Sequence, residues 1–462
     1  MMTANFCMNE KGMRFSLRSR VASGAGPTLG NHGEARQAKI KFALFLCGVL
    51  FLLFASPLRA QTKNSCLDCH SKLEGAMRVT SESIQSDVHA QKGITCTSCH
   101  GGDASSDDKS KSMSPAAGYL GQFDRKQIPE LCAKCHSDAA YMRGFNPSLR
   151  TDQLSEYHAS VHGQMLAKGD DKVAVCIDCH GVHDILPPDD PRSTVYPVNV
   201  APTCGKCHAN AEYMKAYNIP TDQLALYNAS VHHTELVEKG DLSAPTCTTC
   251  HGSHGAAPPG VKSVANVCST CHVIQGQMYA AGPHKIAFER MGLGSCVTCH
   301  TNHQIVHPTD AFIGTGAGAV CLNCHIEGDT GYGPANQMNK ELTGLAAAIA
   351  RSNDILTRAE EAGVEVGDAQ LELTEARDDL TKARVEIHTV TLSQIEPDIQ
   401  AGMQVTQKTW KAGQAALAEG AYRRKGLLFS SAAVLLVLIG LWLKIRDLET
   451  IDDSPNTKEE GQ

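Results

Sequence analysis

The C-terminal third of the chain alternates apolar and polar positions with the period of a helix. Apolar or small residues recur every three or four positions, and mainly Glu, Asp, Arg and Lys stand between them. This spacing predicts amphipathic helices that pack along a common seam. The seam positions are Met338, Leu342, Leu345, Ile349, Ser352, Leu356 and Ala359, then Val366, Ala369, Leu373, Ala376, Leu380, Ala383, Ile387 and Val390, then Ile399, Met403, Thr406, Trp410, Gly413 and Leu417.

Breaks in this pattern divide the region into helices. Gly363 and Gly367 bracket one break, and Pro397 stands where a third helix could begin. We predict an antiparallel hairpin of two helices of about 27 residues, roughly 40 Å each, and then a third helix, together forming a coiled-coil segment over 335–425. His388 lies off the seam and is expected to face solvent.

An uncharged run follows the predicted coiled coil. Residues 426–443 are long enough to span a bilayer, and Tyr422 and Trp442 stand near the two ends as interfacial aromatics do. We predict a single transmembrane helix here and a short cytoplasmic tail at 444–462. The alternative is a buried core helix, but a helical hairpin offers little core to receive it.

A shorter apolar run lies near the N-terminus. Residues 42–55 follow Arg36, Lys39 and Lys41, and Ala60 stands at a plausible cleavage position. This layout is that of a secretory signal peptide, so residues 1–60 are expected to be a leader. Lipidation at Cys47 is a weaker alternative, because Leu46 lacks a small side chain.

The middle of the chain, residues 61–330, repeats the pattern Cys-X-X-Cys-His nine times, which takes eighteen of the twenty cysteines. The cysteine pairs are Cys66 and Cys69, Cys96 and Cys99, Cys132 and Cys135, Cys176 and Cys179, Cys204 and Cys207, Cys247 and Cys250, Cys268 and Cys271, Cys296 and Cys299, and Cys321 and Cys324. The histidines that close the motifs are His70, His100, His136, His180, His208, His251, His272, His300 and His325.

This pattern is the attachment signature of c-type haem. The two thiols form thioethers with the porphyrin vinyl groups, and the histidine becomes the proximal iron ligand. Zinc sites need two half-sites and no histidine after every pair, and disulfides would leave the histidines unexplained. The sequence therefore predicts nine covalently attached haems c.

The motifs are arranged in internal repeats. Residues 132–183 and 204–254 share the elements Thr-Asp-Gln-Leu, Ala-Ser-Val-His and a final Cys-X-X-Cys-His-Gly-X-His. Looser versions occur at 66–100 and 268–303, and the motif at 321–325 stands alone. The region is thus expected to hold four haem pairs and one further haem. Residues 101–118, rich in Gly, Asp, Ser and Lys, suggest either a mobile linker or a disordered surface loop.

Further histidines are candidate distal ligands, and ten of them lie between Cys66 and His325. Seven recur at equivalent places in the repeats and are predicted metal ligands: His89, His162, His183, His232, His254, His284 and His303. Three others are equally consistent with ligands or ordinary surface histidines: His158, His233 and His307. Methionine ligation remains an alternative at Met77, Met142, Met214, Met278 or Met291, although methionine more often fills cores. The sequence does not pair distal histidines with motifs.

Composition supports a haem-filled interior. Nine motifs within residues 66–325 leave too little protein to bury each haem separately, and aromatic residues make up only 5% of the chain. The haems must then lie against one another, in a mainly α and irregular fold with few strands. The net charge is −7, and because residues 1–60 contribute +6, the remainder carries −13. No nucleic-acid partner is expected.

The repeated Ser-Val-His and Cys-X-X-Cys-His-Gly-X-His units resemble those of the multihaem c-type cytochromes of anaerobic respiring bacteria. The resemblance covers about residues 62–330, and members with a C-terminal helical segment and anchor are similar over most of the remainder. It implies electron transfer between a quinol-oxidising membrane cytochrome complex and periplasmic or extracellular acceptors, including other periplasmic cytochromes.

The resulting expectation is a single-pass protein on the periplasmic face of the cytoplasmic membrane, with its N-terminal part outside. The positive residues flanking the anchor favour the opposite orientation, three against two, but haem attachment requires the motifs outside. One alternative is a multihaem reductase for nitrite, hydroxylamine or sulfur compounds with one open haem site. Another is a quinol dehydrogenase subunit that contacts the quinone itself, but a single anchor leaves little room for a quinone pocket.

Overall fold

The computed structural model describes residues 64–255 and 263–452. The described residues form helices, turns and irregular segments and include no strand, in agreement with the fold class expected from the sequence. The leader at 1–60 with Cys7 and Cys47, and the last part of the tail, lie outside the described residues.

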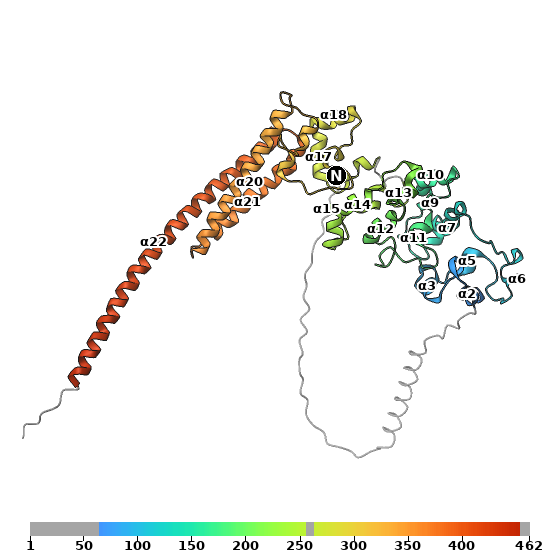
Figure 1. Ribbon diagram of the computed structural model, residues 1–462, viewed down its shortest axis with the longest axis horizontal. Helices are drawn as coiled ribbons and strands as arrows, with labels where there is room; N and C mark the ends of the chain where they lie inside the picture. Colours follow the sequence, from blue (N-terminus) through green and yellow to red (C-terminus); the bar gives the residue numbers. More distant parts are fainter. Residues whose placement is uncertain (1–63, 256–262, 453–462) are drawn as a thin grey trace, which may run out of the picture. The chain divides into compact units, whose positions relative to one another are not determined.

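Short helices make up the motif-bearing region (Figure 1). In chain order the α-helices are α2 (Ser65–His70), α3 (Ser81–Ser86), α4 (Val88–Gln91), α5 (Cys96–His100), α6 (Lys109–Ser112), α7 (Ile128–His136), α8 (Ala139–Met142), α9 (Gln153–Ala159), α10 (Val161–Ala167), α11 (Cys176–His180), α12 (Pro197–His208), α13 (Ala211–Met214), α14 (Gln223–Asn228), α15 (Val231–His233), α16 (Cys247–His251), α17 (Val273–Ala281), α18 (Pro283–Met291) and α19 (Val297–His300).

Single turns of 3₁₀- or π-helix connect them. They are η1 (Gly75–Met77), η2 (Pro115–Ala117), η3 (Arg125–Gln127), η4 (Lys215–Tyr217), η5 (Thr234–Glu238), η6 (Val264–Asn266), η7 (Cys268–Thr270), η8 (Asp310–Phe312) and η9 (Val320–Asn323). The short elements follow from the frequent Gly and Pro in this region, which interrupt backbone hydrogen bonding.

The two sequence repeats fold alike. The series α7 to α11 corresponds to α12 to α16, element by element. Equivalent tyrosines fasten equivalent segments: Tyr157 donates to the Ala174 carbonyl at 2.9 Å, and Tyr227 donates to the Pro245 carbonyl at 3.0 Å. Ser160 Oγ accepts from a backbone N–H in the first turn of α10, as the corresponding serine does in α15.

Residues 101–118 fold back on themselves, which corrects the expected mobile linker or disordered loop. The Gly102 N–H donates to the Ala117 carbonyl at 3.1 Å, so the two ends of the segment meet. Asp108 and Ser114 accept backbone N–H groups and so cap α6 and η2. These polar residues cap short helices, which composition alone does not distinguish from a flexible linker.

Three long helices follow the motif region: α20 (Tyr332–Glu361), α21 (Gly367–Glu386) and, after the turn η10 (Ile387–Thr389), α22 (Leu392–Asp452). All three pack on one another. The core contains most of the predicted seam, including Leu345 and Ala376, which have 0% relative exposure. Ile395, which is not a predicted seam position, is equally buried. The break between α20 and α21 lies at the predicted glycines.

The helix α22 begins at Leu392, so the expectation that it starts near Pro397 is wrong by about one turn. Pro397 is the sixth residue of α22 and therefore lies inside the helix, where it lacks the N–H that would bond to the carbonyl four residues earlier. Gly413 lets α22 approach α20 closely, since a Cβ there would lie 2.6 Å from Ile355 Cγ2. The predicted third helix and the predicted span form one helix of 61 residues.

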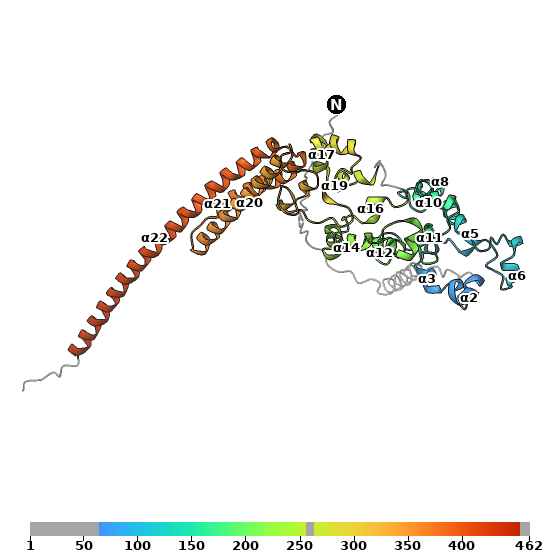
Figure 2. The same ribbon diagram turned by 45° about the horizontal axis from the view of Figure 1, so that its top comes forward.

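The last part of α22 extends beyond its contacts with α20 and α21 (Figures 1 and 2). Every side chain in 426–448 is exposed, and Phe429 reaches 75% relative exposure. The helix contains a candidate membrane span of mean hydropathy 2.4 with none of its window buried. The alternative of a buried core helix is therefore wrong for the described chain.

Candidate haem sites

Each motif occupies one turn of helix or a related turn. Seven helices end at the motif histidine: α2, α5, α7, α11, α12, α16 and α19. Residues separated by three and four positions share a face of a helix, so the two cysteines and the histidine of one motif point to the same side. The local sequence thereby presents two thiols and an imidazole on the side where one porphyrin would lie.

Eight of the nine motif histidines face a second histidine. Their ring centroids lie 5.9–6.4 Å apart. The pairs are His100–His183 at 6.2 Å, His136–His89 at 6.0 Å, His180–His254 at 6.1 Å, His208–His162 at 6.1 Å, His251–His303 at 6.0 Å, His272–His232 at 6.4 Å, His300–His388 at 6.2 Å and His325–His284 at 5.9 Å.

This separation fits one metal ion between two imidazoles. A histidine–metal bond measures about 2 Å, so two rings on opposite sides of one ion have centroids roughly 6 Å apart. Rings in direct stacking contact lie closer, down to about 4.5 Å. The angles between ring planes range from 11° to 89°, as expected for ligands free to rotate about the metal–nitrogen bond. The donor set therefore fits haem iron with two axial histidines.

Burial favours the neutral form of many of these imidazoles. At least one ring in each of the eight pairs has its pKa lowered by burial, because desolvation disfavours the charged form. The affected side chains are His136, His162, His180, His183, His208, His232, His251, His254, His284 and His300. Only the deprotonated ring nitrogen binds a metal, so burial favours the form of these side chains that can act as a ligand.

The histidine pairs link different repeats. A histidine between the two motifs of a pair faces the first motif of the next pair, as His162 faces His208. A histidine after the second motif of a pair faces the second motif of the preceding pair, as His254 faces His180. The repeats are therefore interleaved, and neighbouring repeats complete one another's sites.

The cysteines of consecutive motifs also interact. Within each pair of motifs the first cysteines contact each other: Cys66 and Cys96, Cys132 and Cys176, Cys204 and Cys247, Cys268 and Cys296. Between successive pairs the second cysteines interact electrostatically: Cys99 and Cys135, Cys179 and Cys207, Cys250 and Cys271, Cys299 and Cys324. Consecutive motifs are thus neighbours throughout, in the order of the sequence.

The seven histidines predicted as distal ligands all lie in these pairs, and the structure supplies the pairing that the sequence did not. The eighth partner is His388, and the expectation that it faces solvent is wrong: its half-buried ring lies 6.2 Å from that of His300. The motifs and repeats do not predict this contact, because His388 lies far from the motifs and outside the repeats. Its off-seam position was the available signal, since an off-seam histidine is free to face another part of the protein.

The three histidines that the sequence left as either ligands or ordinary surface histidines contact other groups. His158 Nε2 lies 3.1 Å from Glu130 Oε1, and His307 Nδ1 lies 3.1 Å from the Pro308 carbonyl. His233 packs edge-on against Tyr227 at 5.6 Å. None of the three faces a motif histidine among the described residues. Of the candidate methionines, Met142 and Met214 are buried in the core.

The remaining motif histidine is His70. In the described ranges it is the one motif histidine with no second histidine opposite it. Its Nδ1 lies 3.0 Å from the Met77 carbonyl, which places the Met77 backbone on the side of the ring away from Nε2. The Met77 side chain is 65% exposed. The site at Cys66–His70 therefore differs from the other eight.

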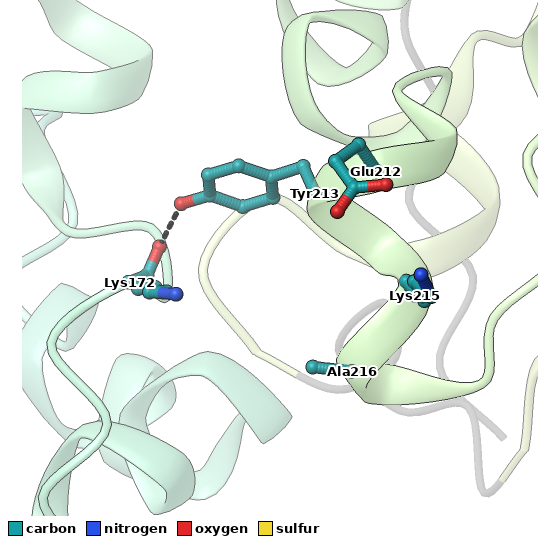
Figure 3. Close-up of a pocket in the computed structure, with 5 residues that line it drawn as sticks. All are labelled: Lys172, Glu212, Tyr213, Lys215 and Ala216. Carbon is teal, nitrogen blue, oxygen red and sulfur yellow. Dashed lines mark hydrogen bonds between the residues drawn. The ribbon is translucent and has the colours of Figure 1, made fainter.

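A hollow of about 480 Å³ lies between the two repeats, lined by Lys172, Glu212, Tyr213, Lys215 and Ala216 (Figure 3). The Tyr213 hydroxyl donates a hydrogen bond to the Lys172 carbonyl across it. No histidine or cysteine lines this hollow, so it belongs to the packing between repeats.

The described residues are helical or irregular and carry nine Cys-X-X-Cys-His motifs, eight of them with a second imidazole opposite the motif histidine, which is the arrangement of a multihaem c-type cytochrome. Residues 88–209, which contain four motifs, match the family model for cytochrome c3. The chain is thus similar to multihaem c-type cytochromes, and the cytochrome c3 family that it matches implies covalently bound haem c.

Two curated relatives are similar to parts of the chain. C-type polyheme cytochrome OmcC of Geobacter sulfurreducens is 24% identical over 257 residues, 54% of this chain and 27% of that protein. Cytochrome c-type protein NrfB of Escherichia coli O6:H1 is 24% identical over 120 residues, 22% of this chain and 62% of that protein. The chain thus spans about a quarter of one relative and three fifths of the other. No solved structure matches it.

Proposed function

We propose that this chain is a membrane-anchored periplasmic electron carrier with nine haems c in a continuous row. In this proposal residues 1–60 form the leader, 61–330 carry the haems, 335–425 form the helical segment, 426–443 cross the membrane and 444–462 form a cytoplasmic tail. When bound, each haem c supplies one-electron Fe(III)/Fe(II) chemistry. The observation that carries the proposal is the sequence-ordered contact between neighbouring motifs.

The contacts between motifs support a path for electrons along the chain. The Cys132 thiol contacts Cys176, and the Cys179 thiol interacts with Cys207. Thioether bonds hold each haem against its own two cysteines, so neighbouring cysteines bring the porphyrin edges together. Electron tunnelling falls off exponentially with separation, and adjacent edges favour transfer between sequence neighbours over transfer between distant motifs.

The histidine pairs support a carrier rather than an enzyme. Two axial histidines fill the coordination sphere of an iron and leave no position for a substrate. Eight motif histidines have a partner in place, from His100 in the second motif to His325 in the last. We assign the seven predicted distal histidines this role, each toward the motif histidine that it faces.

The exposed apolar part of α22 supports the anchor. Leu428 and Leu436 are each 69% exposed, and a soluble protein would not display a continuous apolar surface of this length. The expected partners are a quinol-oxidising membrane cytochrome complex as donor and other periplasmic cytochromes or an extracellular acceptor downstream. The haem-bearing region lies N-terminal to the span, and haem attachment places it on the outer side.

Intact mass spectrometry of the purified protein tests the cofactor count. We expect the polypeptide mass plus nine haems, and the double variant C204A/C207A should lose the mass of one haem. The variant H158A serves as a control and should keep all nine. A polypeptide without added porphyrin mass, or with metal ions alone, would overturn the proposal.

His70 favours a second candidate function. A haem at Cys66–His70 with one unfilled axial position could bind a small substrate, as expected for a reductase of nitrite, hydroxylamine or a sulfur compound. Electron paramagnetic resonance of the oxidised protein should then show a high-spin ferric signal, and the reduced protein should bind one equivalent of carbon monoxide. A signal that is entirely low-spin excludes this function.

The variant M77A distinguishes an open iron from one bound by methionine. An open site keeps its high-spin signal in M77A, whereas a site ligated by Met77 gains that signal only in the variant. M291A is the matched control, because Met291 is also well exposed and lies in another repeat.

A further inference from the structure

His388 lies in the turn η10 between α21 and α22, outside the motif-bearing region. Its ring centroid is 6.2 Å from that of His300, and the two ring planes are 19° from parallel. Both values fall within the ranges of the other seven histidine pairs. Since His300 closes the motif Cys296-Val-Thr-Cys-His, His388 is placed as a distal ligand would be.

The local structure directs one nitrogen of His388 toward His300. Helix α21 ends at Glu386, and Val390 adopts the left-handed region with φ of 46°, so the chain turns sharply around the histidine. His388 Nδ1 donates to the Val385 carbonyl at 2.8 Å. A backbone partner on Nδ1 leaves Nε2 as the free acceptor, which is the usual arrangement of metal-binding histidines.

Packing holds this turn against the haem region. The helix α17 contacts both η10 and α21. Gly282 makes close approach possible, because a Cβ there would lie 2.6 Å from the Thr389 carbonyl oxygen. On the other side Arg384 forms a two-pronged ion pair with Asp310, with Nε–Oδ1 and Nη2–Oδ2 distances of 2.9 and 2.8 Å.

Asp310 in turn belongs to η8, whose Phe312 stacks on His300 with centroids 5.4 Å apart. The ion pair and the aromatic contact therefore position the two histidines from both sides. Asn339 of α20 adds a hydrogen bond to the Asp310 carbonyl at 2.7 Å.

The repeat pattern explains why a histidine is needed there. His100, His180 and His251 each close the second motif of a pair and each face a histidine that follows the second motif of the next pair. His300 closes the second motif of the last pair, and the only motif after it, at 321–325, stands alone. The repeats therefore supply no partner, and His388 occupies the corresponding place.

We propose that Nε2 of His388 is the distal iron ligand of the haem attached at Cys296 and Cys299, so that the long helices complete the last repeat. The inference rests on the proposed haem at this motif. It makes the helical region part of the electron-transfer unit, because the helix that begins four residues after His388 continues into the predicted anchor.

Full-length H388A tests the assignment by electron paramagnetic resonance and carbon monoxide binding. We expect one low-spin ferric signal to be replaced by a high-spin signal, and the reduced variant to bind one more equivalent of carbon monoxide than the parent. Added imidazole should restore the low-spin signal, which a variant that merely misfolds would not do. H307A is the control, because His307 faces no motif histidine, and it should match the parent.

The variant H388M provides a second test. Methionine with histidine raises the reduction potential relative to two histidines, so one midpoint potential should move upward while the iron stays low-spin. Unchanged spectra and potentials in both His388 variants, with nine haems found by mass spectrometry, would overturn the inference and leave the proposed function standing. Absence of haem from the peptide containing Cys296 and Cys299 would instead overturn the proposed function.

Discussion

His180 lies opposite His254 with ring centroids 6.1 Å apart and ring planes 11° from parallel. His180 closes the second motif of the repeat 132–183, and His254 follows the second motif of the repeat 204–254. The pair therefore connects two repeats. Coordination of one iron by both would make each repeat depend on its neighbour for a complete site.

Replacing His254 by alanine should leave the haem at Cys176–His180 with one axial ligand. The expected result is a high-spin ferric signal from one haem and no loss of haem mass, because the thioether bonds do not involve His254. Electron paramagnetic resonance and intact mass together measure this. H233A is the matched control, because His233 lies in the same repeat as His254. An entirely low-spin spectrum in H254A would contradict the pairing.

Loss of a haem from the middle of the row should interrupt electron transfer along it. In C204A/C207A the interactions of Cys204 with Cys247 and of Cys207 with Cys179 are removed, so the two halves are separated by one missing neighbour. Stopped-flow reduction should then become biphasic, and the haems on one side of the missing haem should be reduced much more slowly than in the parent. C66A/C69A removes a terminal haem instead and should keep a single fast phase for the remainder.

Asp329 should lower the reduction potential of the last haem. Its carboxylate lies 3.1 Å from His325 Nδ1, and a negative second partner makes a ligating imidazole more electron-donating. The variant D329N keeps an oxygen acceptor and loses the charge, so the potential of this haem should rise. Potentiometric titration followed by absorbance measures the shift, and D184N, an acidic residue beside another haem, provides a comparison.

The same carboxylate predicts a pH dependence. Burial by itself would raise the pKa of Asp329. Hydrogen bonds from the N–H groups of Ile326, Tyr332 and Gly331 and from the His325 ring outweigh it and lower the pKa to about 2. A carboxyl with a lowered folded-state pKa stabilises the fold above its unfolded pKa of about 3.9 and loses that contribution as the pH falls through about 2. The start of α20 should therefore be unaffected by pH between 5 and 8 and loosen only in strong acid, as hydrogen exchange can measure.

The core of the long helices should be sensitive to truncation of buried seam residues. Leu345 has 0% relative exposure, and L345A should lower the free energy of unfolding of the helical region by about 2–5 kcal/mol through lost burial and a residual cavity. L371A, at a leucine with 71% exposure, should change it by less than about 0.5 kcal/mol. Urea unfolding followed by circular dichroism measures both, and equal effects would contradict the packing.

The exposed end of α22 should determine membrane attachment. A variant that ends after Ala421 retains the last buried residue, Gly420, and lacks the apolar exposed stretch. We expect it to leave the membrane fraction and keep its haem absorbance. A variant that lacks only residues 453–462 should stay in the membrane fraction, and retention of the shorter variant there would contradict the anchor.

The sequence by itself determined the features that depend on near neighbours along the chain. The haem motif needs two cysteines and a histidine within one helical turn, the seam of α20 and α21 follows a period of three and four, and the run at 426–443 needs only its composition. In each case the physical requirement is met within a few residues, so the pattern is visible without the fold.

Only the tertiary structure decided which histidine faces which motif. His162 and His208 lie in different repeats, and His388 reaches His300 from a turn between two long helices. These partners are chosen by how repeats and helices pack, which depends on contacts such as Gly282 with Thr389 and Arg384 with Asp310. A seam pattern records which side of a helix is buried in its own bundle, and it carries no information about a ring at the end of that bundle that points into another part of the protein.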